Sequence, residues 1–116
     1  MINQQEHILL CLSSSTSNPD VIKMAAAVAH ENKAIFTALY VETPDNSKIS
    51  KDDRERLQYN TNLARKLGAN IETAFGFDIA YQINEFCNNA KVTKVFFGHS
   101  QKAVSYTHLT LPTNSL

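Results

Sequence analysis

Glycine is scarce in this chain, and its placement excludes the common phosphate-binding loops. The 116 residues contain 3 glycines, Gly68, Gly76 and Gly98, whereas glycine usually makes up about 7% of a protein. A Walker loop and a dinucleotide-binding fingerprint each need several glycines within one strand–helix turn, and these three lie too far apart. A phosphate held by this protein must therefore be held without a glycine-rich loop.

Net charge and long apolar runs are missing as well. The 11 basic and 11 acidic side chains cancel, which excludes a dedicated polyanion-binding surface but not one small anion site. No apolar run approaches the roughly 18 residues of a membrane span, and the start of the chain lacks the basic and apolar regions of a signal peptide. We therefore expect a cytoplasmic domain that neither enters a membrane nor binds nucleic acid.

Cysteine, metal-ligand patterns and catalytic motifs are sparse. Cys11 and Cys87 lie within apolar patterns and are expected to be reduced core residues. Their separation makes no metal motif, and the four histidines form no set with metal-ligand spacing. A G-x-S-x-G nucleophile elbow is also missing. We accordingly predict no metal, no cofactor and no catalytic residue in this domain.

Apolar runs and helical periods alternate along the chain. Residues 7–12, 34–41, 71–75 and 92–97 predict four strands, and the first is continuously apolar, as in a strand buried on both faces of a parallel sheet. The segments between the runs predict three helices. A βαβαβαβ order with right-handed crossovers gives a three-layer α/β/α sandwich with a mostly parallel sheet.

Polar residues predict where the helices begin. Asn18, followed by Pro19, is expected to cap the first helix, Ser50 with Asp53 the second, and Asp78 the third. Gly68 is a natural end for the second helix. The charged residues after Ser50 are expected to be a solvated helix start; they are Asp52, Asp53, Arg54, Glu55 and Arg56. The third helix is expected to bury Ile79, Ile83, Phe86, Cys87 and Ala90.

The pattern changes after about Gln101. A parallel sheet that ends on a fourth strand usually continues with a helix, but residues 102–116 have no helical period. Their Thr, Tyr and Leu content is compatible with a short strand ending at Pro112. We interpret residues 1–102 as one domain, truncated after its fourth strand, and residues 103–116 as a tail foreign to it. An unpaired sheet edge would favour association, so a homodimer is a candidate assembly.

Five consecutive hydroxyl residues, Ser13 to Ser17, separate the first strand from the first helix. Helix N-termini favour anions, so this run is one way to hold a phosphate without glycine. The alternative is that the serines only fill a turn and cap a helix. Near the same edge, Tyr40 and the backbone of Val41 are candidates to flank a base. Phe36 is more readily explained as a core aromatic, and for Tyr40 both interpretations stay open.

A third loop, Gly98 to Gln101, is expected at the same edge of the sheet, because ligands of open α/β sheets lie beyond the carboxyl ends of the strands. His99 and Ser100 either help to bind phosphate or are plain loop residues. A serine–histidine dyad between Ser13–Ser15 and His99 is disfavoured, because no orienting acid or strained elbow accompanies it.

Over roughly residues 6–101, the order of elements and the segments ILLCLSSSTSN and AIFTALYVETP resemble the universal stress protein domain. More narrowly they resemble this domain in the KdpD family of potassium-responsive sensor histidine kinases. A two-part motif reported for cyclic di-AMP binding by such domains reads S-x-S, twenty residues, then F-T-A-x-Y. Here Ser13–Ser15 is followed by twenty residues and then by Phe36–Tyr40, and every specified position matches.

The resemblance implies a ligand-sensing domain of a sensor kinase, with cyclic di-AMP as regulatory ligand and the rest of the kinase as partner. Ser13 and Ser15 would then contact phosphate or ribose, and the second part of the motif would line the base. The full set of candidate ligand-binding residues is Ser13, Ser14, Ser15, Thr16, Phe36, Thr37, Ala38, Tyr40, Val41, Gly98, His99 and Ser100.

The resemblance also leaves alternatives. ATP-binding universal stress proteins carry a G-x2-G-x9-G-[ST] pattern after the fourth strand, of which only Gly98 fits here, since residue 101 is glutamine. The departure disfavours an ATP-binding stress protein. A structural or dimerisation module without a ligand is the third hypothesis.

Overall fold

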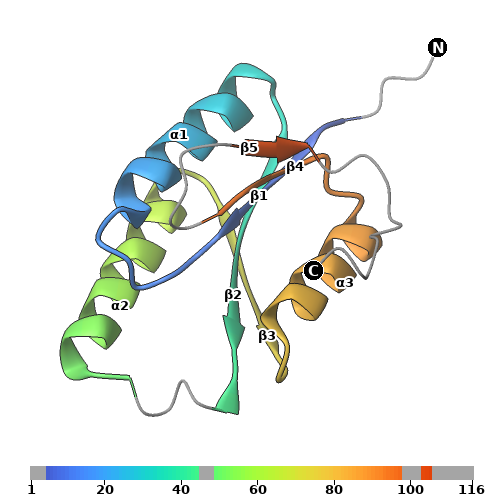
Figure 1. Ribbon diagram of the computed structural model, residues 1–116. Helices are drawn as coiled ribbons and strands as arrows, with labels where there is room; N and C mark the ends of the chain where they lie inside the picture. The colour runs from blue at the N-terminus through green and yellow to red at the C-terminus, as the bar shows by residue number, and fades with distance from the viewer. Residues whose placement is uncertain (1–4, 45–48, 98–102, 106–116) are drawn as a thin grey trace.

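A computed structural model describes residues 5–44, 49–97 and 103–105, and these form a five-stranded sheet with three helices (Figure 1). The elements are β1 (His7–Cys11), α1 (Asn18–Glu31), β2 (Ile35–Glu42), α2 (Lys51–Lys66), β3 (Asn70–Phe75), α3 (Ile79–Ala90), β4 (Lys94–Phe96) and β5 (Ala103–Ser105). The strand order is β3-β2-β1-β4-β5. The first four strands are parallel, and β5 runs antiparallel to β4.

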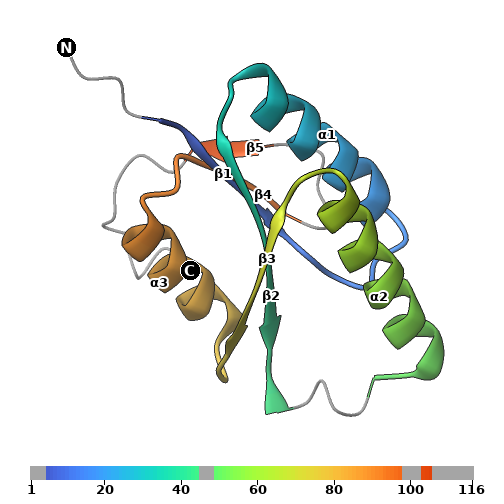
Figure 2. The same ribbon diagram turned by 180° about the vertical axis from the view of Figure 1, so that it is seen from behind.

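The helices form two layers around the sheet. Helices α1 and α2 cover one face and α3 covers the other, as the two opposite views show (Figures 1 and 2). Successive side chains of a strand point to opposite faces, so β1 sends Ile8 and Leu10 under α1, and Leu9 and Cys11 toward α3. The predicted three-layer α/β/α sandwich with a mostly parallel sheet is confirmed.

Two of the three predicted helix caps are present. The Ser50 Oγ accepts a hydrogen bond from the Asp53 amide at 3.1 Å, and the Asp78 carboxylate accepts one from the Tyr81 amide at 3.2 Å. The prediction for Asn18 is wrong, because α1 begins at Asn18 and its N-cap is Ser17. The Asn18 side chain is buried, and its Oδ1 accepts from the Ser13 amide at 3.2 Å, so it holds the preceding loop instead.

The predicted core face of α3 is only partly buried. Cys87 is buried, and Ile83, Phe86 and Ala90 pack in part against the face formed by β1, β2 and β4. Ile79 is 49% exposed, contrary to prediction. Ile79 is the first residue of α3, so no preceding helical turn covers its side chain.

Strand β5 extends the sheet past the four strands expected from the sequence. It lies along β4, with Ala103 opposite Phe96 and Ser105 opposite Lys94. The first residues of the predicted tail therefore take part in the sheet. A domain boundary after residue 102 and a foreign origin of the tail stay predictions, and residues 106–116 lie outside the described part of the chain.

The end of α2 generates a prediction about stability. Gly68 follows the helix with φ +102°, a conformation that residues with a Cβ rarely adopt, and a Cβ there would meet no atom within 4 Å. Gly68→Ala should therefore lower the free energy of unfolding by about 1–2 kcal/mol through backbone strain alone. Urea titration measures the change. Gly68→Asn should cost less, because Asn tolerates this region better, and equal losses in the two variants would contradict the strain argument.

Candidate functional site

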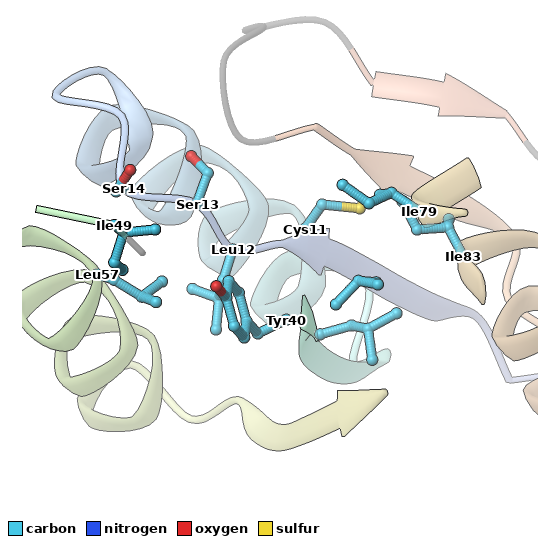
Figure 3. A pocket seen from close by; sticks show the side chains of 11 residues that line it. Cys11, Leu12, Ser13, Ser14, Tyr40, Ile49, Leu57, Ile79 and Ile83 are labelled. Carbon is cyan, nitrogen blue, oxygen red and sulfur yellow. The ribbon is translucent and has the colours of Figure 1, made fainter. Parts of the chain in front are cut away.

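A cavity of about 210 Å³ lies at the carboxyl ends of β1 and β2. Figure 3 shows Ser13, Ser14, Ile49 and Leu57 on one side, Tyr40 in the centre, and Ile79 and Ile83 on the other side near Cys11. Among the described residues, the cavity is lined by Cys11, Leu12, Ser13, Ser14, Leu39, Tyr40, Val41, Ile49, Leu57, Ile79 and Ile83. None of these side chains carries a charge at neutral pH, so the cavity favours an apolar group with polar contacts at the serine loop.

The serine loop, residues 13–17, is organised by its own hydroxyl groups. The Ser13 Oγ accepts from the Ser15 amide at 3.1 Å. The Ser15 Oγ accepts from the Ser17 amide at 3.1 Å and shares a 2.8 Å hydrogen bond with the Ser17 Oγ. Within the described residues, the amides and hydroxyls of Ser14 and Thr16 make no hydrogen bond. These four donors at the start of α1 are therefore available to an anion.

Helix α2 holds the same loop from the side. The Asn60 Nδ2 donates to the Ser13 carbonyl at 2.8 Å and to the Ser15 carbonyl at 3.3 Å. The Arg56 Nε donates to the Ser14 carbonyl at 2.9 Å, and its Nη2 pairs with Asp53. The expectation that Arg56 belongs to a merely solvated helix start is thus wrong, because one of its donors reaches across to the serine loop.

The second half of the motif is divided between the core and the cavity. Phe36 and Ala38 are buried in the core beneath α1 and α2. Thr37 points to the other face, where its Oγ1 lies 2.8 Å from the His7 Nε2. Tyr40 and Val41 line the cavity. Strand alternation separates the two faces of β2, and only the last residues of the strand reach the ligand edge, so Phe36 takes its core interpretation.

Burial suppresses ionisation around the cavity. It raises the pKa of the Cys11 thiol to about 12, with a smaller contribution from nearby Cys87, and it raises the pKa of the Cys87 thiol to about 12. Burial and then the Glu42 carboxylate raise the pKa of the Tyr40 phenol. At neutral pH both cysteines are thiols rather than nucleophilic thiolates, and Tyr40 keeps its O–H. The predicted reduced core cysteines are confirmed.

Three predicted site residues, Gly98, His99 and Ser100, lie outside the described residues. Across residues 5–44, 49–97 and 103–105, no group of three or more His, Cys, Asp or Glu side chains is arranged to hold a metal ion. None of the helices described is long and apolar enough to cross a membrane.

Sensor proteins are similar to this chain in sequence, whereas no family model matches it. Sensor protein KdpD of Clostridium acetobutylicum is 33% identical over 97 residues, which are 84% of this chain and 11% of that protein. Sensor protein KdpD of Escherichia coli is 30% identical over 69 residues, or 60% of this chain and 8% of that protein. The chain thus spans about a tenth of the length of these relatives.

Solved universal stress proteins share the fold. A universal stress protein in complex with cAMP superimposes with a TM-score of 0.60 at 16% identity, covering 80% of this chain and 72% of that chain. The universal stress protein of Archaeoglobus fulgidus in complex with dAMP gives 0.52 at 16% identity, covering 83% and 82%. The chain is a domain with the universal stress protein fold. In sequence it is related to the KdpD sensor proteins, which confirms the resemblance seen in its motifs.

The two thiols predict an alkaline limit to stability. In the unfolded chain a thiol loses its proton near its ordinary pKa of 9.0, whereas in the folded protein both keep theirs to about 12. Their contribution to stability is therefore complete below pH 9 and is lost as the pH rises toward 12. The free energy of unfolding, measured by urea titration from pH 8 to 10.5, should fall above pH 9.

The control for this prediction replaces both thiols. In a Cys11→Ala, Cys87→Ala double variant the free energy of unfolding should be lower at pH 8 but should decline less steeply above pH 9. An unchanged slope would show that other groups cause the alkaline loss.

Proposed function

We propose that this domain is a ligand-sensing module that binds cyclic di-AMP at the carboxyl ends of β1 and β2. The observation that carries the proposal is the lining of the cavity. Ser13 and Ser14 come from the first part of the motif, Tyr40 comes from the second, and the same cavity contacts all three. Twenty residues separate the two parts in sequence, and the parallel pairing of β1 with β2 brings them together.

The donors of the serine loop suit a phosphate. The amides and hydroxyls of Ser14 and Thr16 lie at the start of α1, where the helix dipole adds a partial positive charge. A hydrogen bond to a charged oxygen contributes about 1.5–3 kcal/mol, so neutral donors suffice in a chain without net charge. We propose that the loop of Gly98, His99 and Ser100 makes a second contact with phosphate.

The apolar part of the cavity suits an adenine base. Tyr40 offers a ring face, and Leu12 and Leu57 are on the same side of the sheet. In this proposal Phe36, Thr37 and Ala38 act from within the protein. They fix the position of β2 and thereby the place where Tyr40 and Val41 meet the ligand.

The proposed role involves no chemistry on the ligand. A domain of a cytoplasmic sensor-kinase region would transmit ligand binding by shifting a conformational equilibrium, and the shift is limited by the difference in affinity between the two states. We propose that the partner is the remainder of a KdpD-type histidine kinase and that the signal concerns potassium uptake.

An adenine mononucleotide is the second candidate, and two observations favour it. Universal stress proteins of the same fold are known in complex with cAMP and with dAMP. The cavity of about 210 Å³ is also smaller than the ~300–1,000 Å³ of pockets that hold drug-sized ligands. Its described part therefore suits a single nucleotide, which is one half of a cyclic dinucleotide.

Calorimetric titration distinguishes the candidates. The protein is titrated with cyclic di-AMP, ATP, AMP and cyclic di-GMP, and cyclic di-AMP should give the largest binding constant. If only the mononucleotides bind, the second candidate is correct. If no nucleotide gives heat and none raises the melting temperature at saturating concentration, the domain is a structural module.

Tyr40→Ala tests the base site. Base stacking on an aromatic ring contributes about 1–3 kcal/mol, so the dissociation constant for cyclic di-AMP should rise roughly 5- to 150-fold. The matched control is Tyr59→Ala, because Tyr59 is 61% exposed on α2 and does not line the cavity. Equal affinity of the two variants would remove Tyr40 from the site.

A further inference from the structure

Helix α2 has little apolar contact to fix its position. Of its 16 residues only Asn60 and Ala64 are buried, although Leu57 and Leu63 pack against the core in part. Asn60 is 1% exposed, and a buried amide costs stability unless its hydrogen bonds are made. The bonds that Asn60 makes run to the serine loop. The burial of Asn60 is therefore compensated by its hydrogen bonds to the serine loop, and these bonds fix α2 relative to the loop.

The three hydrogen bonds from α2 to the serine loop are all accepted by main-chain carbonyls. Asn60 donates to the carbonyls of Ser13 and Ser15, and Arg56 donates to the carbonyl of Ser14 between them. In a planar trans peptide the N–H points opposite to the C=O. Each carbonyl turned toward α2 therefore turns the amide of the next residue away from α2.

The two peptide groups held by Asn60 are the ones with available amides. The Ser13 carbonyl belongs to the same peptide as the Ser14 N–H, and the Ser15 carbonyl to the same peptide as the Thr16 N–H. Within the described residues neither amide has a hydrogen-bond partner, whereas the Ser15 amide between them is bonded to the Ser13 Oγ. One buried side chain thus holds both peptide groups whose amides are available, and the Asn18 N–H also donates to the Ser15 carbonyl at 3.2 Å.

We propose that Asn60 is a positioning residue for phosphate binding, assisted by Arg56. It does not touch the ligand; it fixes the two peptide groups of the serine loop so that their N–H groups are pre-oriented for an anion. The inference rests on the proposed binding of an adenine nucleotide and adds to it a specific requirement for the amide group of Asn60.

The test compares Asn60→Asp with Asn62→Asp. Aspartate matches asparagine in shape but has no N–H to give to the two carbonyls. The dissociation constant for cyclic di-AMP, measured by calorimetry, should rise at least 10-fold in Asn60→Asp. Asn62 is exposed two residues further along α2, and its Oδ1 accepts from Arg65, a bond that aspartate keeps. Asn62→Asp should therefore bind within 2-fold of the unaltered protein.

Adenosine separates positioning from general damage. It carries the base and ribose without phosphate, so its affinity should change less than 3-fold in Asn60→Asp. A merely structural role would weaken adenosine and cyclic di-AMP by the same factor, and that result would overturn the inference. Unchanged affinity of Asn60→Asp for cyclic di-AMP would also overturn it.

A second pair of variants applies if Asn60→Asp fails to fold, as circular dichroism would show. Arg56→Met removes the donor to the Ser14 carbonyl from a side chain that is partly exposed, and it should raise the dissociation constant for cyclic di-AMP at least 3-fold. Arg54→Met removes the same charge from an exposed position and should have less effect. Equal effects would indicate charge alone and would overturn the role assigned to α2.

The outcome also separates this inference from the proposed function. If the unaltered protein binds cyclic di-AMP and Asn60→Asp binds it equally well, only the inference fails. If the unaltered protein binds AMP or ATP instead, the same comparison with that nucleotide decides the inference. If it binds none of them, both fail together.

Discussion

Strand β1 is hydrogen-bonded on both sides, to β2 and to β4, and all five of its residues are buried. A parallel strand in this position must leave the sheet at its carboxyl end and cross over one face before the chain can return. The first crossover leads to β2 on one side, and the later crossover through α3 leads to β4 on the other. The loop after β1 therefore lies where the two directions diverge, which is where open α/β sheets bind ligands.

The sequence predicts this framework well because its signals are local. The continuous apolar run of β1, the Ser50 and Asp78 caps and the stop at Gly68 each depend on residues within a few positions of one another. The place of the candidate cavity also follows from topology, because the serine run and Tyr40 meet at the carboxyl edge of the sheet; their binding of a ligand stays a prediction. The motif by itself does not show that Phe36 and Ala38 face the core, although the alternation of β2 contains that information.

The contacts between α2 and the serine loop could not be predicted in the same way. They join residues 42 to 47 positions apart, and they depend on the rotation of α2 about its axis to within one residue. In the sequence, Asn60 is one polar residue among many in a helix rich in charge. Only its burial distinguishes it from Asn62, and burial is a property of the folded domain. For the same reason the sequence predicts Asn18 as a helix cap, whereas in the structure its buried side chain holds the serine loop.

The side chain of His7 makes hydrogen bonds that join three elements at one end of the sheet. Because a carbonyl oxygen only accepts, the ring donates from Nδ1 to the Ala90 carbonyl at 3.0 Å, and Nε2 contacts the Thr37 hydroxyl. The neighbouring Thr93 hydroxyl donates to Glu6 at 2.9 Å. These side chains tie β1, β2 and the end of α3 together at the amino-terminal end of the strands, opposite the cavity. Local opening follows the weakest contacts, so these hydrogen bonds make the end of the sheet opposite the cavity one of the last parts of the domain to open.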